Sequence, residues 1–387
     1  MFESVPLWMM IVGFLLMLGP LVTLHELGHY LVGRFFGVQA VAFSVGFGKE
    51  LAGYTDKRGT RWKLSLLPLG GYVQFKGDMN PASVPDPNAP DEAGAFQHAK
   101  LWQKALIVAA GPVTNLLIAI GIFAAFFMAY GKPVAADPAE ENYVVSFAED
   151  SAAREAGILV GDRIAAIDGE PMRDFRQVQE TIFLYPGKAM EVTVERAGEN
   201  LTIPVTARAS EITDRFGNAM TIGLIGVLTR ETEQGYQSVG PIEAVGLATR
   251  ESGKAMVLMA TGIKQIIVGD RSVKELGGPI SMAKFSGEQL SLGPREFVAF
   301  VAFISINLAF INLLPIPALD GGHLAFYAVQ AIRRKPASPR SQEWAYRTGM
   351  AFVLALMVFV TLIDIAKLPI FGSSEGFDIA KLPIFGS

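Results

Sequence analysis

Four uncharged, strongly apolar runs constrain this chain more than any other feature of its sequence. They cover residues 5–24, 105–131, 297–319 and 348–363. A helix of about 20 residues crosses the ~30 Å apolar layer of a bilayer, and a helix satisfies its own backbone polar groups there. Composition agrees, because 51% of the 387 residues are hydrophobic and only 18% are charged. We therefore predict a polytopic α-helical membrane protein with four transmembrane helices.

The charges that flank these runs predict the orientation of the chain. The loop after the first run and the loop before the fourth are rich in Lys and Arg, which is typical of cytoplasmic loops. Both termini and the long segment between the second and third runs are then expected in the periplasm of a bacterium, with the chain in its inner membrane. A cleaved signal peptide is the alternative for the first run. We expect a span instead, because no Lys or Arg precedes Leu7.

The long segment between the second and third runs is predicted to hold a separate β-rich module. Short alternating strands, such as those at 191–196 and 201–205, lie between Gly-bearing turns within 143–208. Residues 241–268 carry too many charges to span, so we expect an amphipathic helix on the membrane surface. The sequence DIAKLPIFGS occurs at 364–373 and again at 378–387, and we expect the second copy to be an artefact outside the fold.

The predicted organisation follows the chain in ten segments. They are a first span at 5–33, a cytoplasmic loop with hairpin segments at 34–103, a second span at 104–131, the module at 143–208, a linker at 209–240, the interfacial helix at 241–268, a third span at 296–319, a short helix at 324–334, a fourth span at 345–366 and the tail at 374–387.

The end of the first run carries the motif HELGH, in which His25 and His29 are four residues apart. On a helix this spacing places both imidazoles on one face, where they can bind one zinc ion, with Glu26 beside them as a general base. The chain has no cysteine, so the remaining ligands must be His, Asp or Glu. The alternative interpretation is a polar patch that meets lipid headgroups. We favour zinc, because a bound metal offsets the cost of ionisable groups at membrane depth.

The third zinc ligand is predicted from the motif NLLPIPALDGGH at 312–323. Asp320 is our choice, because it follows two helix-breaking prolines and precedes two glycines near the same cytoplasmic face. His323 is the rival ligand, with an ordinary role as an interfacial residue at the start of the next helix. His98 lies in a polar loop, where we expect it to be structural or solvated.

These motifs and their membrane setting resemble the site-two protease family of intramembrane metalloproteases, in particular its bacterial regulator-of-sigma-E type. VGFG at 45–48, LPLGGYVQFKG at 67–77, AGPVTNL at 110–116 and GGPI at 277–280 carry the same resemblance. Residues 153–172 look like part of a PDZ domain, which such proteases insert between their second and third spans. One departure is that the regulator-of-sigma-E type has two PDZ domains in tandem, whereas here only 143–208 reads as one.

The resemblance implies a role for each matching residue. His25, His29 and Asp320 would bind one zinc ion, and Glu26 would be the catalytic base. Asn312 would hold the substrate backbone, whereas Asn307 is either a weaker candidate for that role or a helix-packing amide. The implied substrates are single-span membrane proteins of the anti-sigma factor type and remnant signal peptides, cut after an upstream protease has acted.

Two further segments suggest how a substrate is held. Two strands of a hairpin are indicated around Gly70 by the segments RWKLSLL and GYVQFKG. We expect this hairpin to pair with an unwound substrate through residues such as Val73 and Phe75. A purely structural hairpin is the alternative. The PDZ-like module would bind a substrate C-terminus or act as a steric filter.

We therefore predict an intramembrane zinc metalloendopeptidase. The alternatives are another membrane zinc hydrolase and a non-catalytic PDZ-bearing scaffold. Nucleic-acid binding has no support, because the net charge is −4 and no basic stripe is present.

Overall fold

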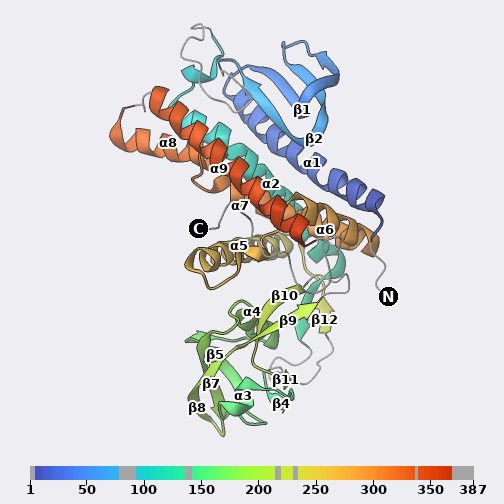
Figure 1. Ribbon diagram of the computed structural model, residues 1–387, viewed down its shortest axis with the longest axis vertical. Helices are drawn as coiled ribbons and strands as arrows, with labels where there is room; N and C mark the ends of the chain where they lie inside the picture. Colours follow the sequence, from blue (N-terminus) through green and yellow to red (C-terminus); the bar gives the residue numbers. More distant parts are fainter. Residues whose placement is uncertain are drawn as a thin grey trace, which may run out of the picture. The chain divides into compact units, whose positions relative to one another are not determined.

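The computed structural model describes residues 5–77, 93–135, 142–213, 219–229, 234–335 and 339–367. The chain divides into two compact units, which are treated separately below (Figure 1). The helical unit is formed by the described parts of 5–125 and 244–387. The inserted unit lies within 126–243.

Four helices in the described part of the chain are long and apolar enough to cross a membrane. They are α1 (Leu7–Phe35), α2 (Leu101–Tyr130), α7 (Pro294–Leu313) and α9 (Pro339–Ala366), whose most apolar windows have mean hydropathies of 1.9 to 2.4. The prediction of a polytopic helical membrane protein is thus confirmed. The third span is shorter than the predicted 296–319, because Leu314 is extended and Pro315 cannot continue the helical hydrogen bonding.

The helix α1 stops soon after the HELGH motif at a glycine cap. Gly37 has a φ of +81°, the left-handed conformation that glycine adopts without strain. Its N–H donates to the carbonyl of Arg34, and the N–H of Val38 donates to the carbonyl of Gly33. This Schellman arrangement satisfies carbonyls at the helix end and turns the chain into the following strand.

The loop after α1 folds as a twisted β-sheet made by β1 (Ala40–Thr55) and β2 (Arg61–Phe75). Residues 40–45 of β1 pair with 71–75 of β2 on one side and with 61–64 on the other, while 50–55 pair with 61–65 at the far edge. The sequence segments 61–67 and 71–77 were predicted to pair with each other. That prediction is wrong, because they belong to one strand and both pair with β1, which contains the VGFG motif. Residues 71–75 thereby form one edge of the sheet.

Three further α-helices lie in the described part of the helical unit. Residues 241–268, predicted to be an interfacial helix, form the helix α5 (Pro241–Val268), whose small residues Ala244 and Ala248 are buried. The helix α6 (Pro279–Leu292) was not predicted, and it packs against α1 so closely that a Cβ on Gly13 would lie 2.7 Å from the Ser286 carbonyl oxygen. The short helix α8 (Asp320–Arg333) begins four residues before the predicted 324. Two short 3₁₀ helices, η1 (Phe96–His98) and η2 (Val273–Glu275), are also present.

The core of the helical unit next to the HELGH motif joins α1, the sheet and α2. Tyr30, Phe43, Phe75 and Ile107 are all buried in this cluster. Burial of such side chains contributes roughly 1.5–3 kcal/mol each before entropy is subtracted, so the sheet is attached to the end of α1 by apolar packing. This attachment places the edge strand 71–75 beside the motif.

The inserted unit, for which the sequence predicts a PDZ-like module, has a four-stranded sheet, two short helices and several two-stranded pairs among its described residues. Its elements are β3 (Lys132–Ala135), β4 (Val144–Phe147), α3 (Ala152–Glu155), β5 (Arg163–Ile167), β6 (Glu170–Pro171), α4 (Phe175–Phe183), β7 (Ala189–Arg196), β8 (Glu199–Thr206), β9 (Arg208–Thr213), β10 (Ala219–Leu224), β11 (Val227–Thr229) and β12 (Gln234–Gln237). The main sheet has the order β6-β5-β7-β8. Ile158, Ile164 and Val192 lie in its buried core.

The inserted unit extends beyond the predicted boundary at residue 208. Part of the predicted linker forms β11, which pairs antiparallel with β4, and Val227 is buried in the core. Further along, β12 pairs with β3 at the two ends of the insertion. These pairings join residues about 80 to 100 positions apart, which alternation in a single segment does not reveal.

Candidate active site

The two motif histidines lie one turn apart on α1 and face the interior. His25 and His29 are each 8% exposed, and their Nε2 atoms are 3.2 Å apart. The Nδ1 atom of His29 lies 2.8 Å from the carbonyl oxygen of Ile107 on α2. A hydrogen on Nδ1 would be donated to that carbonyl, which leaves Nε2 of His29 free to bind a metal.

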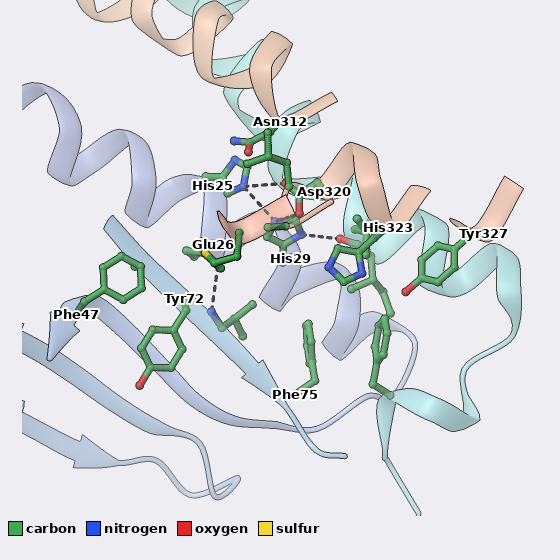
Figure 2. A pocket seen from close by; sticks show the side chains of 18 residues that line it. His25, Glu26, His29, Phe47, Tyr72, Phe75, Asn312, Asp320, His323 and Tyr327 are labelled. Carbon is green, nitrogen blue, oxygen red and sulfur yellow. Dashed lines mark hydrogen bonds and ion pairs between the residues drawn. The ribbon is translucent and has the colours of Figure 1, made fainter. Parts of the chain in front are cut away.

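Asp320 reaches the two histidines from the first turn of α8. Its Oδ2 lies 3.2 Å from His25 Nε2, and its Oδ1 lies 3.5 Å from His29 Nε2 (Figure 2). The chain turns sharply between α7 and α8, with Ala318 at a φ of +82°. A side chain on Gly321 or Gly322 would collide with the backbone of this turn. The LDGG segment therefore delivers the carboxylate because two glycines allow close backbone packing.

The three side chains fit a zinc ion. Their ligand atoms all lie within 4.8 Å of one another, and no other such group of three occurs among the described residues. Apart from its 3.2 Å approach to His25 Nε2, the buried Oδ2 of Asp320 has no hydrogen-bond partner among the described residues. Two imidazole nitrogens and a carboxylate form a donor set that zinc accepts, with a fourth position left for water or substrate.

A glycine on α2 makes room for this site. A Cβ built on Gly111 would lie 2.7 Å from His25 Nε2 and closer still to His29 Nε2. Any side chain there would occupy the space where the metal ligands converge. Gly111 lies within the AGPVTNL motif, but no local pattern in the sequence indicates this role.

The electrostatics of Asp320 favour its charged form. Burial by itself would raise the pKa of the Asp320 carboxyl, but the adjacent His29 and His25 outweigh it and hold that pKa well below its usual range. A charged carboxylate is the form that binds a metal.

Glu26 lies beside the ligands and contacts the sheet. Its Oε2 accepts a hydrogen bond of 3.0 Å from the backbone N–H of Val73 (Figure 2). Val73 belongs to the edge segment 71–75, whose other side pairs with β1. The carboxylate therefore lies at the open edge of the sheet.

A cavity of about 490 Å³ surrounds these groups. Of the four residues predicted to bind substrate, Asn312, Val73 and Phe75 line it, whereas Asn307 is not among the lining residues. The remaining lining is mainly apolar and aromatic and includes Phe47, Tyr72, Phe96, Ile107, Val108, Leu319, Tyr327 and Met350. Such a lining suits apolar peptide segments.

The other two histidines are placed differently. His323 lines the cavity, but it is outside the three-ligand group, and its Nδ1 lies 2.6 Å from the hydroxyl of Tyr346 on α9. His98 lies in η1, also outside the ligand group. The structure therefore places Asp320, rather than His323, against His25 and His29.

A buried His–His–Asp set at the end of a membrane-spanning helix, with a glutamate next to the first histidine, defines a membrane metalloprotease of the HExxH class. The family model for peptidase family M50 matches residues 13–356. The chain belongs to this family, and it is a zinc metalloprotease with His25, His29 and Asp320 as its metal site.

Several relatives are similar to this chain over almost their whole length. A protein of Agrobacterium fabrum named "Putative zinc metalloprotease" is 45% identical over 92% of this chain and 96% of its own. One of Rhizobium meliloti with the same name is also 45% identical, over 91% and 95%. A metalloprotease of Caulobacter vibrioides is 31% identical over 94% and 96%. Among solved structures, a PDZ domain of a Listeria monocytogenes protein matches 23% of this chain and 87% of its own, at 21% identity and a TM-score of 0.19.

Proposed function

We propose that this zinc metalloprotease cleaves peptide bonds within the transmembrane segments of single-span membrane proteins. One observation carries the proposal. The ligands His25 and His29 lie on an apolar membrane-spanning helix, and the neighbouring Glu26 contacts the open edge of a β-sheet. A soluble protease does not need a membrane-spanning helix.

Glu26 is the proposed general base. Glu26 directly follows His25 and lies three residues before His29, and its side chain lines the cavity that the two histidines share. It would take a proton from the attacking water and later deliver a proton to the leaving amine. Zinc bound by His25, His29 and Asp320 would activate the water and polarise the scissile carbonyl.

The edge segment 71–75 is the proposed substrate platform. A transmembrane helix hides its carbonyls in internal hydrogen bonds, so an unwound substrate needs replacement partners. The backbone of Val73 faces Glu26 rather than β1, and an extended chain added to this edge would pass the base. Phe75 would pack against substrate side chains, and the Asn312 amide would hydrogen-bond to the substrate backbone.

The proposed setting is the bacterial inner membrane, with the active site near the cytoplasmic face and the PDZ-like unit in the periplasm. The Lys- and Arg-rich sheet and α8–α9 loop support this orientation. Substrates of the anti-sigma factor type and remnant signal peptides fit an enzyme that accepts a single apolar helix. A bulky periplasmic domain would have to be removed first by an upstream protease.

The test uses purified full-length enzyme and a panel of single-span substrates. Wild type should cleave within the apolar segment, whereas Glu26→Gln and chelator-treated wild type should lose at least about 10²-fold in rate, the lower range for a positioned acid–base group. Readdition of zinc should restore the chelated sample. Equal cleavage by all three samples would refute the proposed mechanism.

A further inference from the structure

We propose that Asn115 on α2 is a positioning residue for the zinc site, whose amide oxygen accepts a hydrogen bond from Nδ1–H of His25. The inference deepens the proposed function and rests on the same metal site. It assigns to the AGPVTNL segment the task of orienting the first metal ligand.

One face of α2 is built around the two ligand histidines. Ile107, Gly111 and Asn115 are spaced four residues apart, so they lie in one row along the helix. The Ile107 carbonyl contacts His29 Nδ1 at 2.8 Å, Gly111 leaves space for the Nε2 atoms, and the amide Nδ2 of Asn115 lies 3.2 Å from His25 Nδ1. Each histidine thus has its own partner on α2.

The chemistry of a metal-bound imidazole determines which amide atom must face His25. When Nε2 binds zinc, Nδ1 carries the hydrogen and needs an acceptor. The carbonyl oxygen of Ile107 meets this need for His29. The amide oxygen of Asn115 meets it for His25 once Oδ1, rather than Nδ2, faces the ring, which a half-turn of the amide about its last bond achieves.

Packing alone gives no reason for an amide at this position. Asn115 is 0% exposed, and its Oδ1 has no hydrogen-bond partner among the described residues. Among the described residues, the Asn115 side chain makes one hydrogen-bonding contact, which is with His25. Burial of such an amide is costly, and an apolar residue of similar volume would remove that cost.

The backbone around Asn115 is held in place by a neighbouring helix. The hydroxyl of Ser305 on α7 donates a 2.7 Å hydrogen bond to the backbone carbonyl of Asn115, and Ser305 is fully buried. This contact fixes the position from which the amide reaches His25. The expected effect of losing the amide is therefore a loosely oriented ligand rather than a displaced helix.

Four full-length proteins test the proposal: wild type, Asn115→Leu, Asn115→Asp and Thr114→Val. Asn115→Leu removes the acceptor but keeps the volume, and Asn115→Asp keeps an acceptor toward His25. Thr114→Val is the matched control, because it removes a polar group from the neighbouring position, where the hydroxyl bonds only to the Ala110 carbonyl among the described residues. Zinc affinity is measured by competition with a chelator. Thermal unfolding of the metal-free protein and the absorption spectrum of the cobalt-loaded protein are also measured.

We expect Asn115→Leu to weaken zinc binding 10- to 100-fold and to change the cobalt spectrum, while the unfolding temperature of its metal-free form is kept or raised. The zinc affinities of Asn115→Asp and Thr114→Val should stay within about threefold of the wild-type affinity, a much smaller change than in Asn115→Leu. Wild-type affinity in Asn115→Leu, or equal losses in the Leu and Asp variants with intact folds, would overturn the proposal. If Asn115→Leu does not fold, Asn115→Ala is judged by the same criterion.

The same experiment separates this inference from the proposed function. Zinc affinity is measured without a substrate, so a wild type that binds zinc but cleaves no transmembrane segment would contradict only the proteolytic proposal. A wild type that binds no zinc would overturn the metal site and this inference together.

Discussion

At the scale of single residues, Gly111 sets the size of the metal site. Its missing side chain leaves the space in which His25 and His29 converge, because a Cβ there would overlap their Nε2 atoms. A methyl group at this position cannot move aside, since it is attached to the backbone of a packed helix. The site therefore depends on a residue that contributes no ligand atom.

We expect Gly111→Ala to lower zinc affinity by more than about tenfold, at least the loss seen when a ligand's supporting contacts are removed. The matched control is Gly121→Ala on the same helix, where a new Cβ would meet nothing within 4 Å. Alanine at position 121 should leave zinc binding unchanged and stabilise the helix by up to about 1 kcal/mol. Elemental analysis after dialysis against a chelator measures the zinc retained by both variants, and thermal unfolding measures their stability. Full zinc retention in Gly111→Ala would contradict the expectation.

At the scale of elements, the two edges of the β1–β2 sheet differ in what they face. Residues 71–75 approach Glu26, whereas 50–55 form the opposite edge. A substrate added as a strand should therefore contact one edge only. Single cysteines introduced at Val73 and Phe75 should crosslink to a substrate trapped on Glu26→Gln, and a cysteine at the exposed Tyr54 should not. Equal crosslinking from Tyr54, or none from 73 and 75, would exclude strand addition at this edge.

In the inserted unit, the pair Asp162–Arg196 ties the segment before β5 to the end of β7. Asp162 is 1% exposed, and both carboxylate oxygens accept hydrogen bonds of 2.7 Å from Arg196. The hydrogen bond from the Arg196 guanidinium holds the pKa of Asp162 below its usual range, although burial opposes this shift.

A lowered pKa in the folded state implies a defined pH dependence. The stabilisation by Asp162 is complete above the unfolded-state pKa of about 3.9 and is lost as the pH falls through the lower folded-state value. Hydrogen-exchange protection of β5 and β7 in the full-length protein should therefore fall on acidification below about pH 4. Asp162→Asn should lower protection already at neutral pH, by about 1–3 kcal/mol, whereas Glu180→Gln, which breaks the exposed Arg176–Glu180 pair, should cost under about 1 kcal/mol. Equal effects of the two variants would contradict the assignment.

At the scale of the whole molecule, the inserted unit is closed at its base by the β3–β12 pair. A deletion of residues 142–229 keeps both of these strands. A deletion limited to the predicted 143–208 would remove β4 and leave β11 without its pairing partner. If the unit is a steric filter, the 142–229 deletion should increase cleavage of substrates that still carry a folded periplasmic domain. Cleavage of pre-trimmed substrates should stay unchanged. An unchanged preference for trimmed substrates would count against filtering.

The sequence by itself determined the four spans, the histidine pair and the chemistry of the ligands. Uncharged runs of this length are stable as helices in lipid, and the spacing of His25 and His29 places them on one helical face wherever that helix lies. Asp320 was also within reach of sequence reasoning, because prolines and glycines mark a bend at the end of the third span.

Only the tertiary structure decided which backbone and side-chain groups surround those ligands. Three arrangements join segments that are distant in sequence. Residues 61–65 and 71–75 pair with the same strand, and the helix α6 packs against α1. The row Ile107, Gly111 and Asn115 faces the two histidines. Local periodicity reports which face of an element is apolar, but it does not report which partner that face meets. The zinc ligands could therefore be predicted one element at a time, whereas their support depends on how the elements pack.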